Sequence, residues 1–506
     1  MTLSALLAAL VAPRLLATAP VLPAVESSAV VTEVAYDSRR VSPGALFVAL
    51  RGQKADGAQF AAAAAGRGAI VIVAETPAPA GIPVPWIVVP DARLALAVLA
   101  DALSDHPSHA LQVIGITGTN GKTTTAYLLR SIFEAAGIKC GLLGTVVYSV
   151  GDRDREATRT TPEAPDLQRM LRQMVTNGCG AAVMEVSSHA LSLKRVDAIR
   201  FAAGVFTNLT RDHLDFHGDM ESYFTAKRRL FELLPPEAPS VVNLDDPRGR
   251  VLATSVPNPA TYAARQPADV TPEPFELSLQ GLTFTARTPA GPVQVRSTLV
   301  GWPNLDNLLA AVATATSLGL PTSAIELGIR NLGGVPGRFQ LVSSPVDDVS
   351  VVVDYAHTDD ALKNLLETAR ALSKGRLITV FGCGGDRDRT KRPLMGAVAG
   401  RMSDVVVVTS DNPRSEDPAG IIEEVLLGIP GAASRGASRG PEVLAIVDRG
   451  EAIARAIDMA RPGDLVIVAG KGHEKTQVIG ERELPFDDVV VSQEALARRR
   501  VAPRAG

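Results

Sequence analysis

The stretch GITGTNGKTTT, residues 115–125, constrains the fold of this chain more than any other part of the sequence. It follows the apolar run LQVI and precedes AYLLRSIFEAAG, so the order of elements is strand, glycine loop and helix. Such a loop points backbone N–H groups and the positive end of the helix dipole at one spot, which suits a phosphate. The common loop GxxxxGKS/T would need glycine at position 116, where this chain has Ile116, so its spacing is unusual.

The loop offers the groups that a nucleotide requires. Gly118 and Gly121 let the backbone approach phosphates, Lys122 can reach the terminal phosphates, and the Thr123 hydroxyl can hold Mg²⁺. A magnesium site also needs a carboxylate, and Glu185 ends the apolar run AAVME, where a charge is costly to bury unless it binds a cation. The structural alternatives are a glycine-rich turn with an incidental Lys-Thr pair, and a glutamate that faces solvent.

Strands and helices alternate along most of the chain, which predicts an α/β fold with parallel sheets. The first segment ends near the polar linker SDHPSHALQ, residues 104–112, and a second α/β pattern, with a helix near 359–373, begins after GGVPGRFQ, residues 333–340. GAASRGASRG, residues 431–440, is expected to form a mobile surface loop. At about 150 residues per domain, the chain of 506 residues predicts three domains, which we place at 1–108, 109–336 and 337–506.

Composition argues against several kinds of partner. The formal net charge of −3 leaves no basic surface for nucleic acid. No apolar stretch reaches the roughly 18 residues of a membrane span. The apolar N-terminus lacks a preceding basic segment, so we expect a packed first helix, not a signal peptide. Its apolar face would comprise Leu3, Leu6, Leu7, Leu10 and Val11. The three cysteines form no metal or disulfide spacing, which fits a cytoplasmic protein.

Two further regions carry concentrated polar chemistry. TNLTRDHLDFHGDMESYFTAKRRLF, residues 207–231, places His213 and His217 within five residues of each other and near Asp212, Asp215 and Lys227. Zinc is possible in principle, although no cysteine ligand accompanies these histidines. In the second α/β unit, polar loops follow each apolar strand, and the carboxyl ends of such strands share one cleft. Their Arg, Asp, Glu and Asn side chains suit a zwitterionic or multiply charged small substrate.

Several motifs, taken in order, resemble the Mur ligase family, the ATP-dependent enzymes that add amino acids to the UDP-muramic acid precursor of peptidoglycan. They are GTNGKTTT, EVSSHAL, TNLTRDHLDFHG, YFTAKRRLF, GRFQ, DYAHTDDALKN, GCGGDRDRTKRP and DNPRSEDP. The family has its own form of phosphate loop, which accounts for the shifted glycine. DSRRVSPGALFVALRGQKADG, residues 37–57, is similar to the UDP-binding domain of the tripeptide-forming member. The resemblance implies a UDP-binding domain, a central P-loop-type parallel-sheet ATPase domain and a Rossmann-like, amino-acid-binding C-terminal domain.

The resemblance also implies a reaction and its residues. ATP phosphorylates a substrate carboxylate, and an amine then attacks the acyl phosphate. Lys122, Glu185, His213 and Lys227 would be catalytic, with Thr123 and Glu185 on one Mg²⁺ and His213 and a carbamylated Lys227 serving a second. ATP would contact Gly118, Thr119, Asn120, Gly121, Lys122, Thr123, Thr124, Asn307, Arg338 and Asp354. The UDP-N-acetylmuramoyl dipeptide would contact Ser38, Gln53, Lys54, Ala55, Thr160, Thr161, Ser187 and Arg195.

The segment DNPR, residues 411–414, resembles the signature of members that add meso-diaminopimelate and not lysine. Diaminopimelate carries a carboxylate that lysine lacks, and Arg414 can form a bidentate pair with it. Glu474 suits the ammonium group. The full set that the resemblance implies for diaminopimelate is Arg387, Asp411, Asn412, Pro413, Arg414, Gly470 and Glu474.

Two departures and several alternatives accompany this interpretation. Leu193 stands where the family often has glutamine, and Pro303 stands where an aromatic residue or histidine is frequent. A lysine-adding relative is disfavoured by DNPR, and folylpolyglutamate synthetase should lack both DNPR and the first domain. A silent nucleotide-binding scaffold has no need for Lys122, Glu185, His213 and Lys227 together. We expect a monomer.

Overall fold

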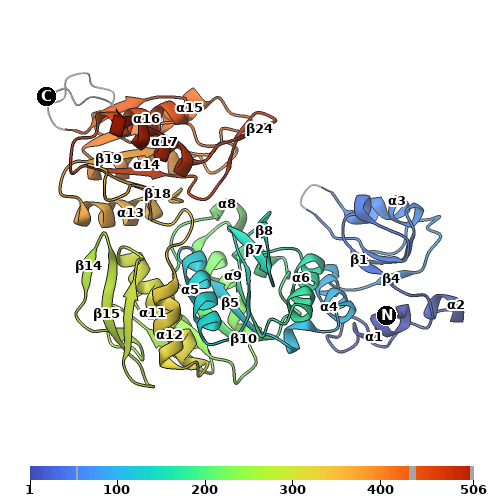
Figure 1. Ribbon diagram of the computed structural model, residues 1–506. Coiled ribbons are helices and arrows are strands. Elements are labelled where there is room, and N and C mark those ends of the chain that lie inside the picture. The colour runs from blue at the N-terminus through green and yellow to red at the C-terminus, as the bar shows by residue number, and fades with distance from the viewer. Residues whose placement is uncertain (53–54, 432–439, 502–506) are drawn as a thin grey trace.

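A computed structural model describes residues 1–52, 55–431 and 440–501 of the chain. It is an α/β structure with separate sheets along the chain, which confirms the predicted fold class. In Figure 1 the N-terminal sheet lies at one side of the central domain, and the C-terminal sheet with its helices lies above it. Most of the predicted surface loop 431–440 lies outside the described residues. No helix among the described residues is both long and apolar enough to cross a bilayer.

The N-terminal segment forms a parallel four-stranded sheet of order β1-β2-β3-β4. Leu46 and Val48 of one strand enter one core cluster, whereas Phe47 enters the cluster on the other face, as the two-residue period of a strand requires. The predicted first helix is confirmed over Leu3–Ala8. Leu3, Leu6, Leu7 and Leu10 are fully buried, whereas Val11, also predicted for the apolar face, lies beyond the helix and is half-buried. The elements are α1 (Leu3–Ala8), α2 (Ala24–Ser27), β1 (Glu33–Ala35), β2 (Ala45–Val48), α3 (Ala61–Gly66), β3 (Ala69–Ala74), β4 (Trp86–Val88) and α4 (Ala92–Leu103).

The central sheet has eight strands in the order β12-β11-β10-β5-β9-β6-β7-β8, and β7 alone runs antiparallel to its neighbours β6 and β8. Side chains of α5, α11 and α12 share the core on one face, and those of α6 and α9 share the core on the other. The elements are β5 (Gln112–Thr117), α5 (Lys122–Ala135), β6 (Cys140–Leu143), β7 (Val147–Val150), β8 (Arg153–Glu156), α6 (Ala164–Thr176), β9 (Ala181–Glu185), α7 (Ser188–Ser192), β10 (Phe201–Phe206), α8 (Leu214–His217), α9 (Met220–Glu232), β11 (Ser240–Asn243), α10 (Pro247–Ala253), β12 (Pro259–Tyr262), α11 (Trp302–Ser317) and α12 (Thr322–Asn331).

The C-terminal segment forms a six-stranded sheet, and two smaller antiparallel sheets comprise β13 to β16 and β23 with β24. The C-terminal sheet has the order β17-β18-β22-β19-β20-β21, with β17 alone antiparallel. The predicted helix near 359–373 is confirmed as α13. The antiparallel strands are β13 (Thr271–Pro272), β14 (Glu276–Ser278), β15 (Gly281–Arg287), β16 (Val293–Ser297), β23 (Thr476–Ile479) and β24 (Arg482–Pro485). The C-terminal elements are β17 (Gln340–Leu341), β18 (Ser350–Asp354), α13 (Asp359–Leu372), β19 (Leu377–Phe381), α14 (Lys391–Met402), β20 (Val405–Val408), α15 (Pro418–Leu426), β21 (Glu442–Ala445), α16 (Arg449–Met459), β22 (Leu465–Ala469) and α17 (Asp488–Val501).

A buried ion pair ties the carboxyl end of the C-terminal sheet to two helices. Arg449, at the start of α16, and Asp488, at the start of α17, both have fully buried side chains. The guanidinium donates to Asp488 at 2.8 and 2.7 Å and to the carbonyl of Ala469 at 3.0 Å. Ala469 ends β22 and precedes Gly470, so this pair supports the loop that begins there.

Removing one partner of this pair should lower the free energy of unfolding much more than removing both partners. We expect Arg449→Met to lower the free energy of unfolding by about 3–5 kcal/mol, because Asp488 is left buried and uncompensated. The double variant with Asp488→Leu should regain most of that loss. Urea denaturation followed by circular dichroism measures both effects, with exposed Arg482→Met as the control. Equal losses in the single and double variants would contradict the prediction.

Candidate active site

The glycine loop takes the shape that a phosphate site needs, and two of its glycines are required sterically. Gly118 has φ +145°, and a Cβ there would lie 1.9 Å from the Thr207 hydroxyl. Gly121 has φ +89°, and a Cβ there would lie 2.3 Å from Asn307 Oδ1. Both conformations disfavour side chains, so these positions explain the glycine pattern better than the common spacing does.

Behind the loop, the threonine and the glutamate that were predicted to hold a metal ion contact each other. The Thr123 hydroxyl donates to Glu185 Oε1 at 3.0 Å, and both residues are buried. Thr145, which the sequence analysis missed, donates its backbone N–H at 2.8 Å and its hydroxyl at 3.0 Å to the same carboxylate. Among the described residues, Glu185 forms no ion pair. Thr145 lies just after the end of β6, and this position at the carboxyl end of a strand is the sequence signal that could have identified it.

Two lysines approach the loop from different directions. Lys122 folds back onto the loop and donates to the carbonyls of Gly118 at 3.0 Å and Thr119 at 2.8 Å. Lys227, on α9, is only 2% exposed and donates to the Gly118 carbonyl at 2.7 Å. Burial, together with the nearby charge of Lys122, holds the pKa of Lys227 well below its usual range. The fold therefore favours a neutral amine at Lys227.

Arg338 brings the second α/β unit to the loop. Its guanidinium donates to the Thr123 hydroxyl at 3.1 Å, across the boundary between the central and C-terminal sheets. Asp354 accepts from the N–H groups of Phe339 at 2.6 Å and Ala356 at 2.8 Å, and burial raises its pKa. Asn307 accompanies both residues in the lining of one cavity, so the three residues predicted to hold adenosine and phosphate face the glycine loop.

Three histidines crowd the other side of the loop. The ring of His189 lies 4.9 Å from that of His213 and 5.5 Å from that of His217. Burial lowers the pKa of His213 and of His217 to about 4. No group of three His, Cys, Asp or Glu residues in the described part of the chain is arranged to hold a metal ion by itself. The zinc alternative thus gains no support.

Two cavities adjoin at this point. The first, of 280 Å³, contains the loop, and the second, of 540 Å³, opens onto the C-terminal loops. Asp212, His213, Tyr355 and His357 line both. The first cavity brings together the predicted Thr119, Asn120, Gly121, Lys122, Thr123, Thr124, Thr160, Glu185, Ser187, His213, Asn307, Arg338 and Asp354.

The second cavity brings together all but one of the residues predicted for the amino acid. They are Arg387, Asp411, Asn412, Arg414, Gly470 and Glu474, whereas Pro413 does not line it. Arg414 has φ +52° and donates to the carbonyl of Gly385 at 2.8 Å. Burial and the neighbouring charge of Arg387 both lower the pKa of Arg414, so two guanidinium groups share this space. Such a pair favours an anionic ligand.

The residues predicted for the muramoyl dipeptide fall into two places. Thr161 donates to the carbonyl of Glu185 at 2.9 Å and to Ser187 at 3.3 Å, and Arg195 donates to the carbonyl of Thr161 at 3.1 Å. Thr160 lies 3.1 Å from Thr145, hydroxyl to hydroxyl. Ser38 and Ala55 lie in the N-terminal segment, and no hydrogen bond between described residues joins either one to this cluster. Gln53 and Lys54 lie outside the described residues.

The two departures from the family pattern have simple structural settings. Pro303 lies at the first turn of α11 and lines the smaller cavity. The first turn suits proline, because backbone N–H groups there have no helical partner. Leu193 caps the C-terminal end of α7 and is half-buried.

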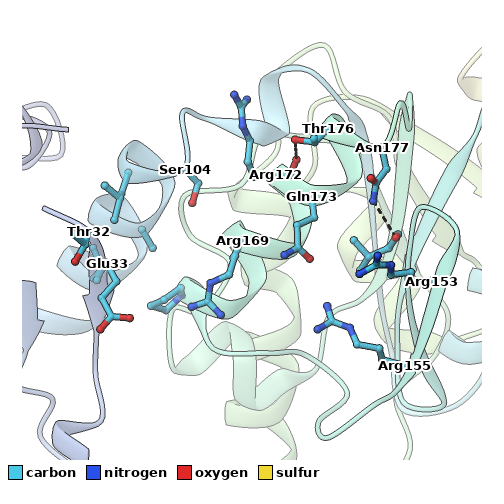
Figure 2. Close-up of a pocket in the computed structure, with 15 residues that line it drawn as sticks. Thr32, Glu33, Ser104, Arg153, Arg155, Arg169, Arg172, Gln173, Thr176 and Asn177 are labelled. Atoms are coloured by element: carbon cyan, nitrogen blue, oxygen red, sulfur yellow. Dashed lines mark hydrogen bonds between the residues drawn. The ribbon is translucent and has the colours of Figure 1, made fainter. Parts of the chain in front are cut away.

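A third cavity lies away from all these residues. It has a volume of 670 Å³ and lies between the N-terminal segment and α6 (Figure 2). Arg153, Arg155, Arg169 and Arg172 line it, but none of the predicted site residues does. The cavity with the larger volume is therefore not the one that the predicted site residues line. Most of those residues line the other two cavities.

Comparison with known proteins agrees with this geometry. Three family models match: the Mur ligase family catalytic domain over residues 30–103, the Mur ligase middle domain over 116–315 and the Mur ligase glutamate ligase domain over 337–472. The chain is 48% identical over 469 residues to the UDP-N-acetylmuramoyl-L-alanyl-D-glutamate--2,6-diaminopimelate ligase of Geobacter metallireducens, covering 89% of this chain and 91% of that one. The Gloeobacter violaceus protein of the same name is 48% identical over 465 residues, with coverage of 92% and 93%.

Solved structures show the same relationship. A structure of a ligase with that name superposes with a TM-score of 0.68 at 34% identity, covering 99% of this chain and 100% of the other. The MurF ligase of Thermotoga maritima in complex with ADP gives a TM-score of 0.62 at 18% identity, covering 92% and 98%, which shows a shared fold.

His473 should make stability depend on pH. Its pKa is lowered from 6.5 to about 4 by burial and by the charges of Arg338 and Lys475. A histidine with a lowered folded-state pKa contributes stability above the unfolded-state value, and this contribution is lost as the pH falls from 6.5 towards 4. We expect His473→Gln to reduce the loss of unfolding free energy between pH 7 and pH 5 by about 1 kcal/mol.

Thermal and urea unfolding of wild type and variant at both pH values measure this difference. His109→Gln is the matched control, because His109 is exposed. An unchanged pH dependence in His473→Gln would show that His473 does not stay neutral in the folded protein.

Proposed function

Because the chain belongs to the Mur ligase family, we propose that it joins meso-2,6-diaminopimelate to UDP-N-acetylmuramoyl-L-alanyl-D-glutamate, with ATP as co-substrate. The chain is an ATP-dependent, amide-forming ligase of peptidoglycan precursor synthesis. The observation that carries the proposal is the meeting of two cavities at Asp212 and His213. One cavity holds a phosphate loop, and the other holds paired guanidinium groups and a carboxylate, Glu474.

The geometry suits a reaction in two steps. In the first, the terminal phosphoryl group of ATP passes to a carboxylate oxygen of the dipeptide, which yields an acyl phosphate and ADP. In the second, the amine of the incoming amino acid attacks the acyl carbon, the amide bond forms, and inorganic phosphate leaves with the electron pair of the C–O bond. Both steps build negative charge, so donors such as Lys122 and Arg338 are needed beside the reacting groups.

The residues around Glu185 fit a magnesium ion. Glu185 is 1% exposed, and its contacts from Thr123 and Thr145 are neutral hydroxyl and N–H groups. A buried carboxylate without a cationic partner is unfavourable, and a bound cation removes that cost. Thr123 and Glu185 would hold Mg²⁺, which would supply charge neutralisation for the transferring phosphoryl group.

Lys227 fits a carbamate. Only a neutral amine adds to carbon dioxide, which forms an N–C bond and releases one proton, and burial lowers the pKa of this amine and so favours its neutral form. The product is an anion beside the glycine loop, where the unmodified ammonium would repel a metal. We propose that carbamylated Lys227 and His213 serve a second Mg²⁺.

The amino-acid cavity favours diaminopimelate over lysine. Burial and the like charge of Arg387 lower the pKa of Arg414, and a second substrate carboxylate would relieve this repulsion. Lysine has no such group and would not relieve this repulsion. The lysine-adding reaction stays the alternative to be tested. For the cellular setting we propose a cytoplasmic monomer, in keeping with three free, buried cysteines.

Substrate-dependent release of phosphate tests the function directly. Purified protein receives ATP, Mg²⁺ and UDP-N-acetylmuramoyl-L-alanyl-D-glutamate, with either meso-diaminopimelate or L-lysine. We expect release with diaminopimelate to exceed release with lysine by about 10-fold or more, since a hydrogen bond to a charged group contributes about 1.5–3 kcal/mol and Arg414 is half-buried. Release with lysine alone would overturn the assignment of Arg414. No release in either tube from folded protein would favour a scaffold.

Removal of the Lys227 amine should abolish activity, and an added carboxylic acid should restore part of it. We expect Lys227→Ala to reduce the rate on the order of 100-fold or more, because an anionic group is lost from the phosphoryl-transfer site. A short carboxylic acid such as acetate should restore part of the rate by occupying the space of the carbamate. Lys363→Ala, an exposed lysine of α13, is the control. Failure of any carboxylic acid to rescue would count against the carbamate.

A further inference from the structure

Lys471 is a buried cation that the mechanism above does not use. It follows β22 and stands between Gly470 and Gly472, which both have positive φ. Its side chain is fully buried, yet the residue does not line the amino-acid cavity. Its ammonium donates to Asn412 Oδ1 at 3.1 Å and to Glu474 Oε2 at 2.9 Å. Lys471 therefore touches two cavity residues from behind.

These contacts decide which way the Asn412 amide faces. Oδ1 accepts from Lys471 and also from the backbone N–H of Val478 at 2.9 Å. Nδ2 donates to Glu474 Oε2 at 2.8 Å. An inverted amide would place its NH₂ group against two donors, so the amide has one favourable orientation. Lys471, Asn412 and Glu474 thus form a closed triangle of hydrogen bonds.

The triangle leaves two polar atoms for a ligand. Glu474 receives both of its contacts on Oε2, and no hydrogen bond from the described residues reaches Oε1. Asn412 Nδ2 has a second N–H, for which the described residues likewise provide no acceptor. The cavity thus receives one donor and one carboxylate oxygen from this triangle, with Arg414 beside them. An amino-acid head offers the complement, a carboxylate and an ammonium on one tetrahedral carbon.

We infer that Lys471 is a positioning residue that holds Asn412 and Glu474 in the one orientation that reads the distal head of diaminopimelate, including the handedness of its carbon. This inference rests on the proposed function. Three fixed points, at Asn412, Glu474 and Arg414, distinguish the two configurations of the distal centre. Lys471 exerts this effect through its two neighbours and not by contact with the substrate.

The test compares two lysines of the same loop. Lys471→Met keeps the length of the side chain but removes its charge and hydrogen bonds, and Lys475→Met is the matched control, since Lys475 is exposed and paired with Asp487. In Lys471→Met we expect the KM for meso-diaminopimelate to rise about 10- to 100-fold, as for loss of hydrogen bonds to charged groups. The KM values for ATP and for the dipeptide substrate should stay within about twofold of wild type.

The preference for meso- over LL-diaminopimelate is a second readout, and a loss of packing alone would not change it. LL-diaminopimelate differs from the meso isomer at one centre, and the preference for meso over LL should fall about tenfold or more in Lys471→Met. Lys471→Gln, neutral but able to donate, should fall between wild type and Lys471→Met. It also carries the test if the methionine variant does not fold. A meso preference that equals the wild-type value in a folded Lys471 variant would overturn the inference.

A double-mutant cycle with Glu474→Gln identifies the route of the effect. If Lys471 acts through Glu474, Lys471→Met should add less than about threefold in the Glu474→Gln background. Independent, multiplicative effects would refute the positioning role. Failure of the proposed function looks different, because wild-type protein would then release no phosphate with any diaminopimelate isomer.

Discussion

Hydrogen bonds between the glycine loop and the segment after β10 hold the phosphate-binding backbone in place. The N–H of Thr119 donates to the Asn208 carbonyl at 2.9 Å, and the N–H of Asn120 donates to Asn208 Oδ1 at 2.9 Å. The Thr207 hydroxyl donates back to the Asn120 carbonyl at 2.6 Å. This close approach is possible only because Gly118 has no Cβ. Without this close approach, the loop would not present Lys122 and Thr123 to a nucleotide.

The same loop also anchors the C-terminal unit. Arg338 reaches Thr123, Asn120 donates to Asp360 at 3.3 Å, and Arg211 pairs with Asp359 at 2.7 Å. Each contact joins the central domain to the C-terminal one, and Asp359 and Asp360 lie at the start of α13. Because the carboxyl ends of two parallel sheets face each other here, the phosphoryl donor and the amine acceptor can share one enclosed space. The relative position of the domains is therefore part of the catalytic geometry.

The fold and the loop chemistry were accessible from sequence because they depend on local patterns. Alternating strands and helices predicted the sheets, and the glycine pattern predicted the phosphate loop. The roles of Asn307 and Arg338 came from family resemblance, since no local pattern brings residues so distant in sequence to one loop. Thr145 was missed for the same reason. The ligand-binding and catalytic roles of all the predicted site residues, and the three domain boundaries, stay predictions.

The site gathers titratable side chains that form no ion pair with the residues that the structure describes. Glu185 is buried without an ion pair among the described residues, burial lowers the pKa of the Lys227 amine, and Arg387 and Arg414 face one cavity together. Elsewhere the fold neutralises such groups, as Arg449 and Asp488 show. A folded chain tolerates unpaired charges only when its remaining packing is sufficient, and each ligand that supplies the missing charge then stabilises the folded state. Binding and stability are thereby linked at the same residues, and substrates of the correct charge complete the structure.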